Sequence, residues 1–254
     1  MDFLAVISGF GVGAIVGLTG VGGGSLMTPL LIGAFGLAPA AAIGTDLWFA
    51  ALTKSGGSWA HHRLGHVDYR VTKLLLAGSL PATVATIAFM HYTGITKAWG
   101  STLSVALGVA LLLTAVSVAC RGWWADAGLR LEGRLLPHRS ALTVTSGALL
   151  GVLVSLSSIG AGAIGATLLL ILYPRLQAHR IVGTDIAHAV PLTLVAGIGH
   201  AFLGHVEWAL LAALLVGSLP GIWLGARLTR AMPERLVRAV LCVSLVGAGV
   251  KVLV

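Results

Sequence analysis

The chain has 254 residues and a net charge of +8, and 57% of its residues are hydrophobic while only 9% are charged. Because soluble domains carry about 25% charged residues, this composition excludes a water-soluble globule and predicts an integral membrane protein that exposes its apolar excess to lipid. The basic residues stand singly between apolar runs, which excludes the basic stripe of a nucleic-acid-binding protein, so no nucleic-acid partner is expected.

The first apolar stretch covers residues 3–35, which is longer than one ordinary membrane span needs. Clustered glycines weaken a helix, and they occupy the segment from Thr19 to Ser25, shortly before Pro29. We therefore predict a broken helix or a re-entrant helical hairpin there. Three ordinary transmembrane helices are expected next, at about residues 43–60, 71–92 and 98–119.

A polar stretch at residues 120–140 separates this half from a second half of the same design. The second half opens with another long apolar stretch, residues 141–173, whose predicted break lies at 157–162, and three spans follow at about 182–202, 207–227 and 235–254. Continuous apolar runs and 35 glycines favour helices over the alternating strands of a membrane barrel. The predicted units are a first transmembrane repeat (1–119), a cytoplasmic linker (120–140) and a second transmembrane repeat (141–254).

The two halves share sequence motifs, which indicates a duplication. A shift of 139 positions superimposes three motifs on their copies: Gly44-Thr45-Asp46 on Gly183-Thr184-Asp185, Leu64-Gly65-His66-Val67 on Leu203-Gly204-His205-Val206, and Gly78-Ser79-Leu80-Pro81 on Gly217-Ser218-Leu219-Pro220. We therefore expect the same set of elements in each half.

The basic residues indicate the topology, because loops rich in Lys and Arg stay in the cytoplasm. If each long stretch returns to its starting side, the basic loops lie on one face and only Lys97 and Lys251 lie on the other. If each long stretch crosses once, the basic loops are divided between the faces, so the first arrangement is favoured. Each half then makes an odd number of crossings, which predicts two inverted repeats with both termini extracytoplasmic.

The glycine run from Gly20 to Gly24, the Gly-Thr-Asp of each half and the repeated Gly-Ser-Leu-Pro resemble those of the sulfite exporter TauE/SafE family of membrane transporters. The resemblance covers nearly the whole chain. It implies transport of a small anion, such as sulfite, an organosulfonate or a related oxyanion or organic acid, across the bacterial cytoplasmic membrane. One departure is Ala161, which stands where the first half has Gly23.

Helices broken within the membrane suit anion binding, because the second segment starts with free backbone N–H groups and the positive end of the helix dipole. The alternative is that the glycines only let neighbouring helices touch. The candidate substrate-binding residues at the two breaks are Thr19, Gly20, Gly22, Gly23, Gly24, Ser25, Ser157, Ser158, Gly160 and Gly162.

Four ionisable residues inside the predicted spans are further candidates. Lys54 lies in mid-span, where a lysine costs about 2.5 to 3.5 kcal/mol on insertion scales, so we expect it to attract the anion unless it snorkels to a boundary. Its counterpart in the second half is Thr193. Asp46 and Asp185 follow Gly-Thr at the expected starts of spans, where they either cap a helix or, with His188, couple transport to protons or cations.

The predicted function is secondary transport of a small anion by alternating access, with the substrate and the lipid bilayer as partners and a homo-oligomer left open. The alternative is a divalent metal permease that uses His61, His62, His66, His200 and the aspartates. No carboxylate or cysteine set completes a metal cluster around these histidines, so neither a metal site nor a cofactor is expected. The sequence contains no motif of nucleophile and base, so an enzyme is not predicted.

Overall fold

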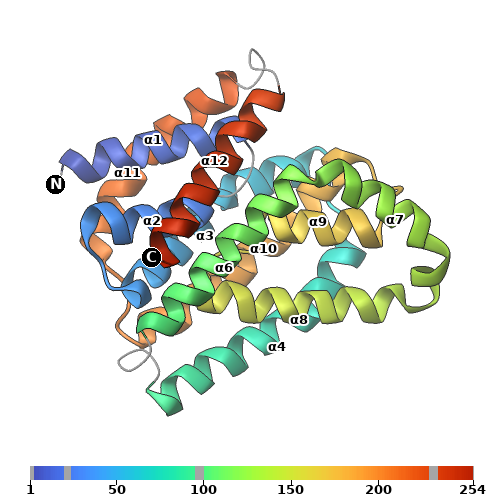
Figure 1. The fold of residues 1–254 in the computed structure, drawn as a ribbon, viewed down its shortest axis with the longest axis horizontal. Helices are drawn as coiled ribbons and strands as arrows, with labels where there is room; N and C mark the ends of the chain where they lie inside the picture. The colour runs from blue at the N-terminus through green and yellow to red at the C-terminus, as the bar shows by residue number, and fades with distance from the viewer. Residues whose placement is uncertain (1–2, 20–23, 95–99, 229–233, 254) are drawn as a thin grey trace.

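The computed structural model describes residues 3–19, 24–94, 100–228 and 234–253. These residues contain no strand, and the fold class predicted from composition, an all-helical membrane protein, is confirmed. The elements are α1 (Phe3–Thr19), α2 (Gly24–Phe35), α3 (Pro39–Arg63), α4 (Tyr69–Thr93), α6 (Gly100–Ala119), α7 (Arg121–Leu135), the 3-10 turn η1 (Leu136–His138), α8 (Arg139–Ser157), α9 (Ala163–Leu172), α10 (Ala178–Phe202), α11 (Trp208–Leu228) and α12 (Glu234–Leu253) (Figure 1).

Several helices have the length and hydropathy of membrane spans. Within the described residues, five stretches are long and apolar enough to cross a membrane: Tyr69–Thr93, Thr102–Ala119, Arg121–Ser157, Ala178–Phe202 and Trp208–Gly225. The third of these includes the polar linker, which the structure shows as helix α7 leading through η1 into α8. The linker is therefore ordered secondary structure that packs on α9.

The break in the second half is a real interruption of the helix. Helix α8 ends at Ser157 and α9 begins at Ala163. Between them Ser158, Gly160 and Gly162 all have positive φ angles, of 58°, 126° and 139°, and glycine adopts such angles at little cost. In the first half α1 ends at Thr19 and α2 begins at Gly24.

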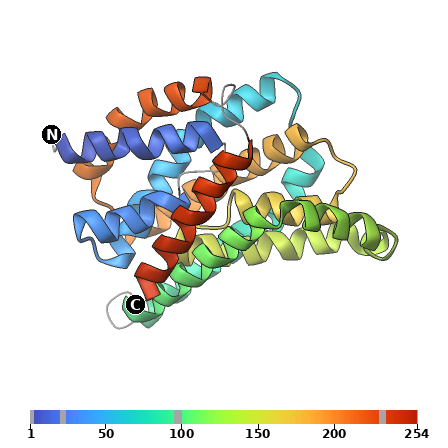
Figure 2. The ribbon, with the colours of Figure 1, turned by 45° about the horizontal axis from the view of Figure 1, so that its top comes forward.

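The first helix of each half packs against a helix of the other half. Helix α1 lies along α11 of the second half, and its counterpart α8 lies along α4 of the first half (Figures 1 and 2). Each of these two contacts is therefore the reciprocal of the other. The sequence repeat is therefore also a repeat of tertiary contacts.

Small residues at these two interfaces bring the backbones together, as is common between membrane helices. A methyl group at Gly13 of α1 would lie 2.4 Å from the carbonyl oxygen of Ser218 on α11. At the equivalent interface, a methyl group at Gly151 of α8 would lie 2.4 Å from the carbonyl oxygen of Ser79 on α4. The repeated Gly-Ser-Leu-Pro motif thus supplies part of the contact surface in both halves.

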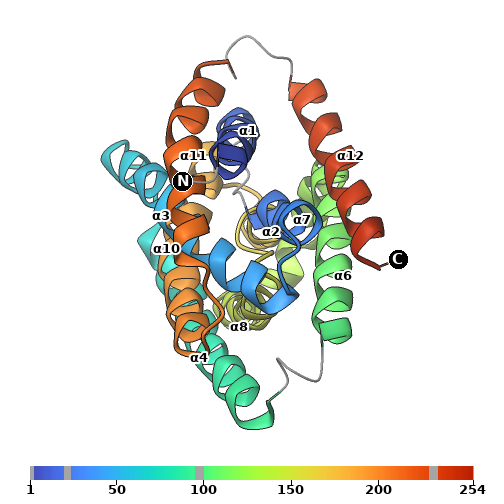
Figure 3. The ribbon, with the colours of Figure 1, turned by 90° about the vertical axis from the view of Figure 1, so that its left-hand side faces the viewer.

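The central helices α3 and α10 are counterparts of each other and pack in opposite directions. Gly44, near the start of α3, faces His200 near the end of α10, whereas Gly57 near the end of α3 faces Ile186 near the start of α10. Figure 3 shows α2 between the side formed by α3 and α10 and the side formed by α6 and α12. Helices α6 and α12, a second pair of counterparts, also contact each other.

The Gly-Thr-Asp motif holds the two halves together through its threonine. The backbone N–H of Glu207, before α11, donates to the Thr45 hydroxyl at 3.0 Å. In the reciprocal contact, the backbone N–H of Asp68, before α4, donates to the Thr184 hydroxyl at 2.9 Å. Thr45 of the first half therefore anchors the loop before α11, and Thr184 of the second half anchors the loop before α4.

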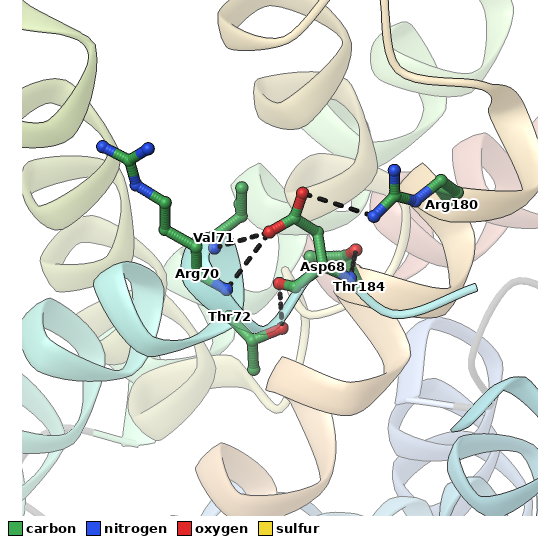
Figure 4. Close-up of polar contacts among 6 residues, drawn as sticks. All are labelled: Asp68, Arg70, Val71, Thr72, Arg180 and Thr184. Atoms are coloured by element: carbon green, nitrogen blue, oxygen red, sulfur yellow. Dashed lines mark hydrogen bonds and ion pairs between the residues drawn. The ribbon is translucent and has the colours of Figure 1, made fainter. Parts of the chain in front are cut away.

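Asp68 shows how this anchor is built (Figure 4). Its carboxylate caps α4 by accepting from the backbone N–H groups of Arg70 and Val71 at 3.1 and 3.2 Å, a favoured role for aspartate at a helix start. The same carboxylate pairs with Arg180 of α10 at 3.6 Å. The loop between α3 and α4 is thus fixed to α10 by both its backbone and its side chain.

Candidate functional site

Lys54 of α3 reaches the break between α8 and α9. Its side chain is buried, with 9% of its surface exposed, and its Nζ donates to the Ala161 carbonyl oxygen at 2.6 Å. That carbonyl is available because residues 158–162 are outside both helices. A charge from the first half therefore lies at the broken helix of the second half.

Two buried carboxylates lie within electrostatic reach of the Lys54 ammonium, namely Asp46 on the same helix and Asp185 on α10. Asp46 accepts a hydrogen bond from the Thr28 hydroxyl of α2. Asp185 faces the start of α9, where a methyl group at Gly165 would lie 2.1 Å from its Oδ1 atom. The site thus combines one ammonium with two carboxylates.

The structure contradicts the interpretation of the two aspartates as helix caps. Helix α3 already begins at Pro39 and α10 at Ala178, so both aspartates lie about two turns inside their helices. The N-cap residues are Ala38 of α3 and Gln177 of α10, and neither side chain makes a capping hydrogen bond. The two carboxylates therefore do not cap these helices and instead lie in the buried site.

His188 also belongs to this buried region, one turn beyond Asp185. Its Nε2 is 3.0 Å from the hydroxyl of Ser79 on α4, and it interacts electrostatically with Lys54. The hydrogen bond that the structure gives His188 is therefore to Ser79 and not to Asp185. Helices α3, α4 and α10 thus each contribute a polar side chain.

Several polar atoms of the site have no protein partner, although buried polar groups are nearly always hydrogen-bonded. Four such atoms come from residues near Lys54: Asp46 Oδ1, Ser158 Oγ, Asp185 Oδ1 and His188 Nδ1. The Ser158 hydroxyl approaches Asp46 without completing a hydrogen bond of normal geometry. Water or a polar ligand between these atoms would satisfy them.

The other candidate residues of the second break have different surroundings. The Ser157 hydroxyl donates to the Leu153 carbonyl at 2.7 Å and accepts from the Ile159 N–H at 3.2 Å, so it is used within the turn. Gly160 accepts from the N–H of Gly165 at 2.9 Å, and the Gly162 N–H faces Asp185. Of the four, Ser158 and Gly162 are therefore the two that interact with the buried aspartates.

The candidate residues of the first break are only partly described. Gly20, Gly22 and Gly23 lie outside the described residues. Thr19 ends α1, whereas Gly24 and Ser25 begin α2.

The histidines near the end of α3 form ring contacts and hydrogen bonds. His66 lies 3.3 Å from His61 between their Nδ1 atoms and packs against the His179 ring, and His62 bonds the Tyr69 hydroxyl. In the described ranges, no group of three or more His, Cys, Asp or Glu residues is placed to hold a metal ion.

Four elements of the site were missed by sequence reasoning: Thr28, Ser79, the Ala161 carbonyl and Gly165. Ser79 lies in the repeated Gly-Ser-Leu-Pro motif, which could have drawn attention to it. Nothing in the sequence distinguishes Thr28 from other threonines, and the Ala161 carbonyl becomes an acceptor only because the helix ends before it.

Known proteins resemble this chain along its whole length. The family model described as sulfite exporter TauE/SafE matches residues 5–252. Three probable membrane transporter proteins of Bacillus subtilis (strain 168) are similar: YjnA with 37% identity over all of both chains, YdhB with 27% over 98% of this chain and 99% of its own, and YunE with 24% over 97% and 95%. No solved structure matches significantly. The chain belongs to the sulfite exporter TauE/SafE family.

Proposed function

We propose that this protein is a secondary transporter of a small anion and that Lys54 at the second break is the charge that binds it. The observation that carries the proposal is the buried ammonium hydrogen-bonded to the Ala161 carbonyl within a broken helix. The family membership and the names of the three relatives support transport across a membrane. Sulfite, organosulfonates and related oxyanions or organic acids are the substrate class.

The surroundings of Lys54 supply what an oxyanion needs. Hydrogen bonds with an ionised donor or acceptor are stronger than those between neutral groups. Lys54 offers three N–H donors, and the structure shows one of them bonded to the Ala161 carbonyl. The unpartnered Ser158 hydroxyl and the first N–H groups of α9 lie at the same break. An oxyanion here would replace the carbonyl as the partner of Lys54.

The relation between the halves supports alternating access. The counterpart helices α3 and α10 run in opposite directions, which supports inverted repeats around a central site. Two conformations in which the halves exchange roles would expose the site to one side of the membrane at a time. Both termini are then extracytoplasmic, and residues 120–140 are cytoplasmic.

A lysine-to-methionine exchange tests the proposal, because methionine approximates the unbranched stem of lysine and lacks the charged ammonium. In proteoliposomes, Lys54→Met is expected to lower the exchange of radiolabelled sulfite, methanesulfonate or acetate at least about tenfold, since a hydrogen bond to a charged group contributes roughly 1.5 to 3 kcal/mol. Lys73→Met, on an exposed position of α4, is the matched control and should exchange these anions normally.

Two outcomes would contradict the proposal. Unchanged exchange in Lys54→Met would exclude Lys54 as the binding charge. Uptake of divalent metal ions that rises in Lys54→Met would instead support a cation permease, because removing a positive charge favours cation binding.

A further inference from the structure

Asp185 lies at the start of α9, where the proposed function places the anion. Its carboxylate lies against the first turn of α9, beside the N–H of Gly162 and in the space left by the missing side chain of Gly165. It also interacts with the ammonium of Lys54. The positive end of a helix and a lysine are the two features that attract an anion, and the carboxylate of Asp185 lies against the one and within electrostatic reach of the other.

The surroundings of Asp185 differ from those of its counterpart Asp46. Asp46 has a hydrogen-bond donor, the Thr28 hydroxyl. The Oδ1 atoms of both carboxylates lack a hydrogen-bond partner, but that of Asp185, a residue with only 3% of its surface exposed, lies against the first turn of α9. A buried carboxylate oxygen that points at the break without a donor is a suitable acceptor for a proton.

We propose that Asp185 is a tethered competitor of the substrate anion and that the anion binds when a proton neutralises it. Protonation removes the negative charge that Lys54 and the start of α9 face, and both become available to the anion. When the proton leaves, Asp185 regains these partners and the anion is released. This inference rests on the proposed function, because it assumes that the anion binds at Lys54.

The charges of the site determine how many protons accompany the anion. The titratable groups that face Lys54 are Asp46 on its own helix and Asp185 and His188 on α10. His188 is counted as neutral, since its Nδ1 has no acceptor for the second proton of an imidazolium. Thr28 of α2, Ser79 of α4 and the described residues of the break add only hydroxyl and backbone groups.

With one lysine and two ionised aspartates, the empty site carries one net negative charge. Adding one proton and one monovalent anion leaves this charge unchanged. The empty and the loaded protein therefore cross between their two conformations with the same charge in the membrane. Transport is expected to be electroneutral, with one proton moving in the same direction as each monovalent anion.

The test measures the binding of methanesulfonate, which stays a monovalent anion over the range from pH 5 to 8, by its effect on the thermal unfolding of the detergent-purified protein. In the wild type, affinity should fall by up to about tenfold per pH unit as Asp185 loses its proton, since one proton accompanies each anion. Asp185→Asn mimics the neutral carboxyl group. It should bind methanesulfonate at pH 8 as tightly as the wild type does at pH 5, without pH dependence.

Asp126→Asn is the matched control, because Asp126 is exposed on α7 and the exchange is the same. It should retain the pH dependence of the wild type. In liposomes, an inward proton gradient should drive methanesulfonate accumulation by the wild type and by Asp126→Asn, but not by Asp185→Asn, which should still exchange methanesulfonate.

A second measurement does not depend on how the variant folds. When methanesulfonate is added to the wild-type protein in weakly buffered solution, about one proton should be taken up per anion bound. No proton uptake on binding, or an Asp185→Asn protein that keeps the pH dependence of the wild type, would overturn the role of Asp185 and leave Lys54 as the anion site. Absence of any Lys54-dependent binding of methanesulfonate and sulfite would overturn both proposals.

Discussion

Two residues of the site, Lys54 and His188, differ from the residues at the equivalent positions of the other half. Lys54 corresponds to Thr193, whose hydroxyl bonds the carbonyl of Ala189 in its own helix. His188 corresponds to Phe49, which is fully buried. The described charge cluster therefore forms at one break, between α8 and α9, and the second half of the chain supplies the break while the first half supplies the ammonium.

The threonines of the two Gly-Thr-Asp motifs, in contrast, have the same role in both halves. Thr45→Val and Thr184→Val each leave a backbone N–H without its acceptor, that of Glu207 or Asp68. Each substitution is expected to cost about 1 to 3 kcal/mol, which lowers the midpoint of thermal unfolding by several degrees in a chain of this size.

Unfolding of the detergent-purified variants, followed by circular dichroism, measures this loss. Thr93→Val is the control, because the Thr93 hydroxyl is exposed and bonds only the Phe89 carbonyl of its own helix, so little change is expected. A normal midpoint for both Thr45→Val and Thr184→Val would show that the cross-half hydrogen bonds do not hold the halves together.

At the scale of elements, glycine and hydropathy patterns predicted the break between α8 and α9 and most of the spans, because both depend on local properties of the chain. The predicted spans at 43–60 and 235–254 correspond to α3 and α12, which are not among the described stretches that are long and apolar enough to cross a membrane. The pattern placed the starts of α3 and α10 several residues too late, and this error made Asp46 and Asp185 look like caps. Pro39, favoured in the first helical turn, was the available signal for α3. Which helices pack together, such as α1 with α11, could not be predicted because it depends on tertiary contacts.

Two glycines of α1 provide a test of the packing between α1 and α11. Gly13→Ala places a methyl group 2.4 Å from the Ser218 carbonyl oxygen of α11, so the helices must separate, whereas Gly11→Ala meets no atom within 4 Å. Gly13→Ala should destabilise the protein by roughly 1 to 3 kcal/mol, as overpacking does. Gly11→Ala should be neutral or stabilise by up to about 1 kcal/mol.

Thermal unfolding of the two variants in the same detergent gives the comparison. Equal midpoints for Gly13→Ala and Gly11→Ala would mean that α1 and α11 do not approach as closely as the structure shows.

At the scale of the whole molecule, the relation of the halves predicts where the chain lies in the membrane. The start of α1 and the end of α12 lie toward one side of the molecule and α7 lies at the opposite side (Figures 1 and 2). Along the pair α6 and α12, Cys242 contacts Ala115 while Gly249 faces Leu111, so the two counterparts run in opposite directions. This order supports the inverted topology that the basic residues predicted.

Cysteine labelling tests that topology with two exposed positions at opposite ends of the helix pair. Cys120, which follows α6, is an exposed native cysteine, and Lys251 is exposed near the end of α12. In a Cys242→Ser background, a membrane-impermeant maleimide added to intact cells should not react with Cys120. In the same background with Cys120→Ser, the maleimide should label Lys251→Cys, because the inverted repeats place this end of α12 outside the cytoplasm. Opening the membrane should make Cys120 reactive, which controls for its accessibility. Labelling of both positions from the same side would contradict inverted repeats, and alternating access would then need a different relation between the halves.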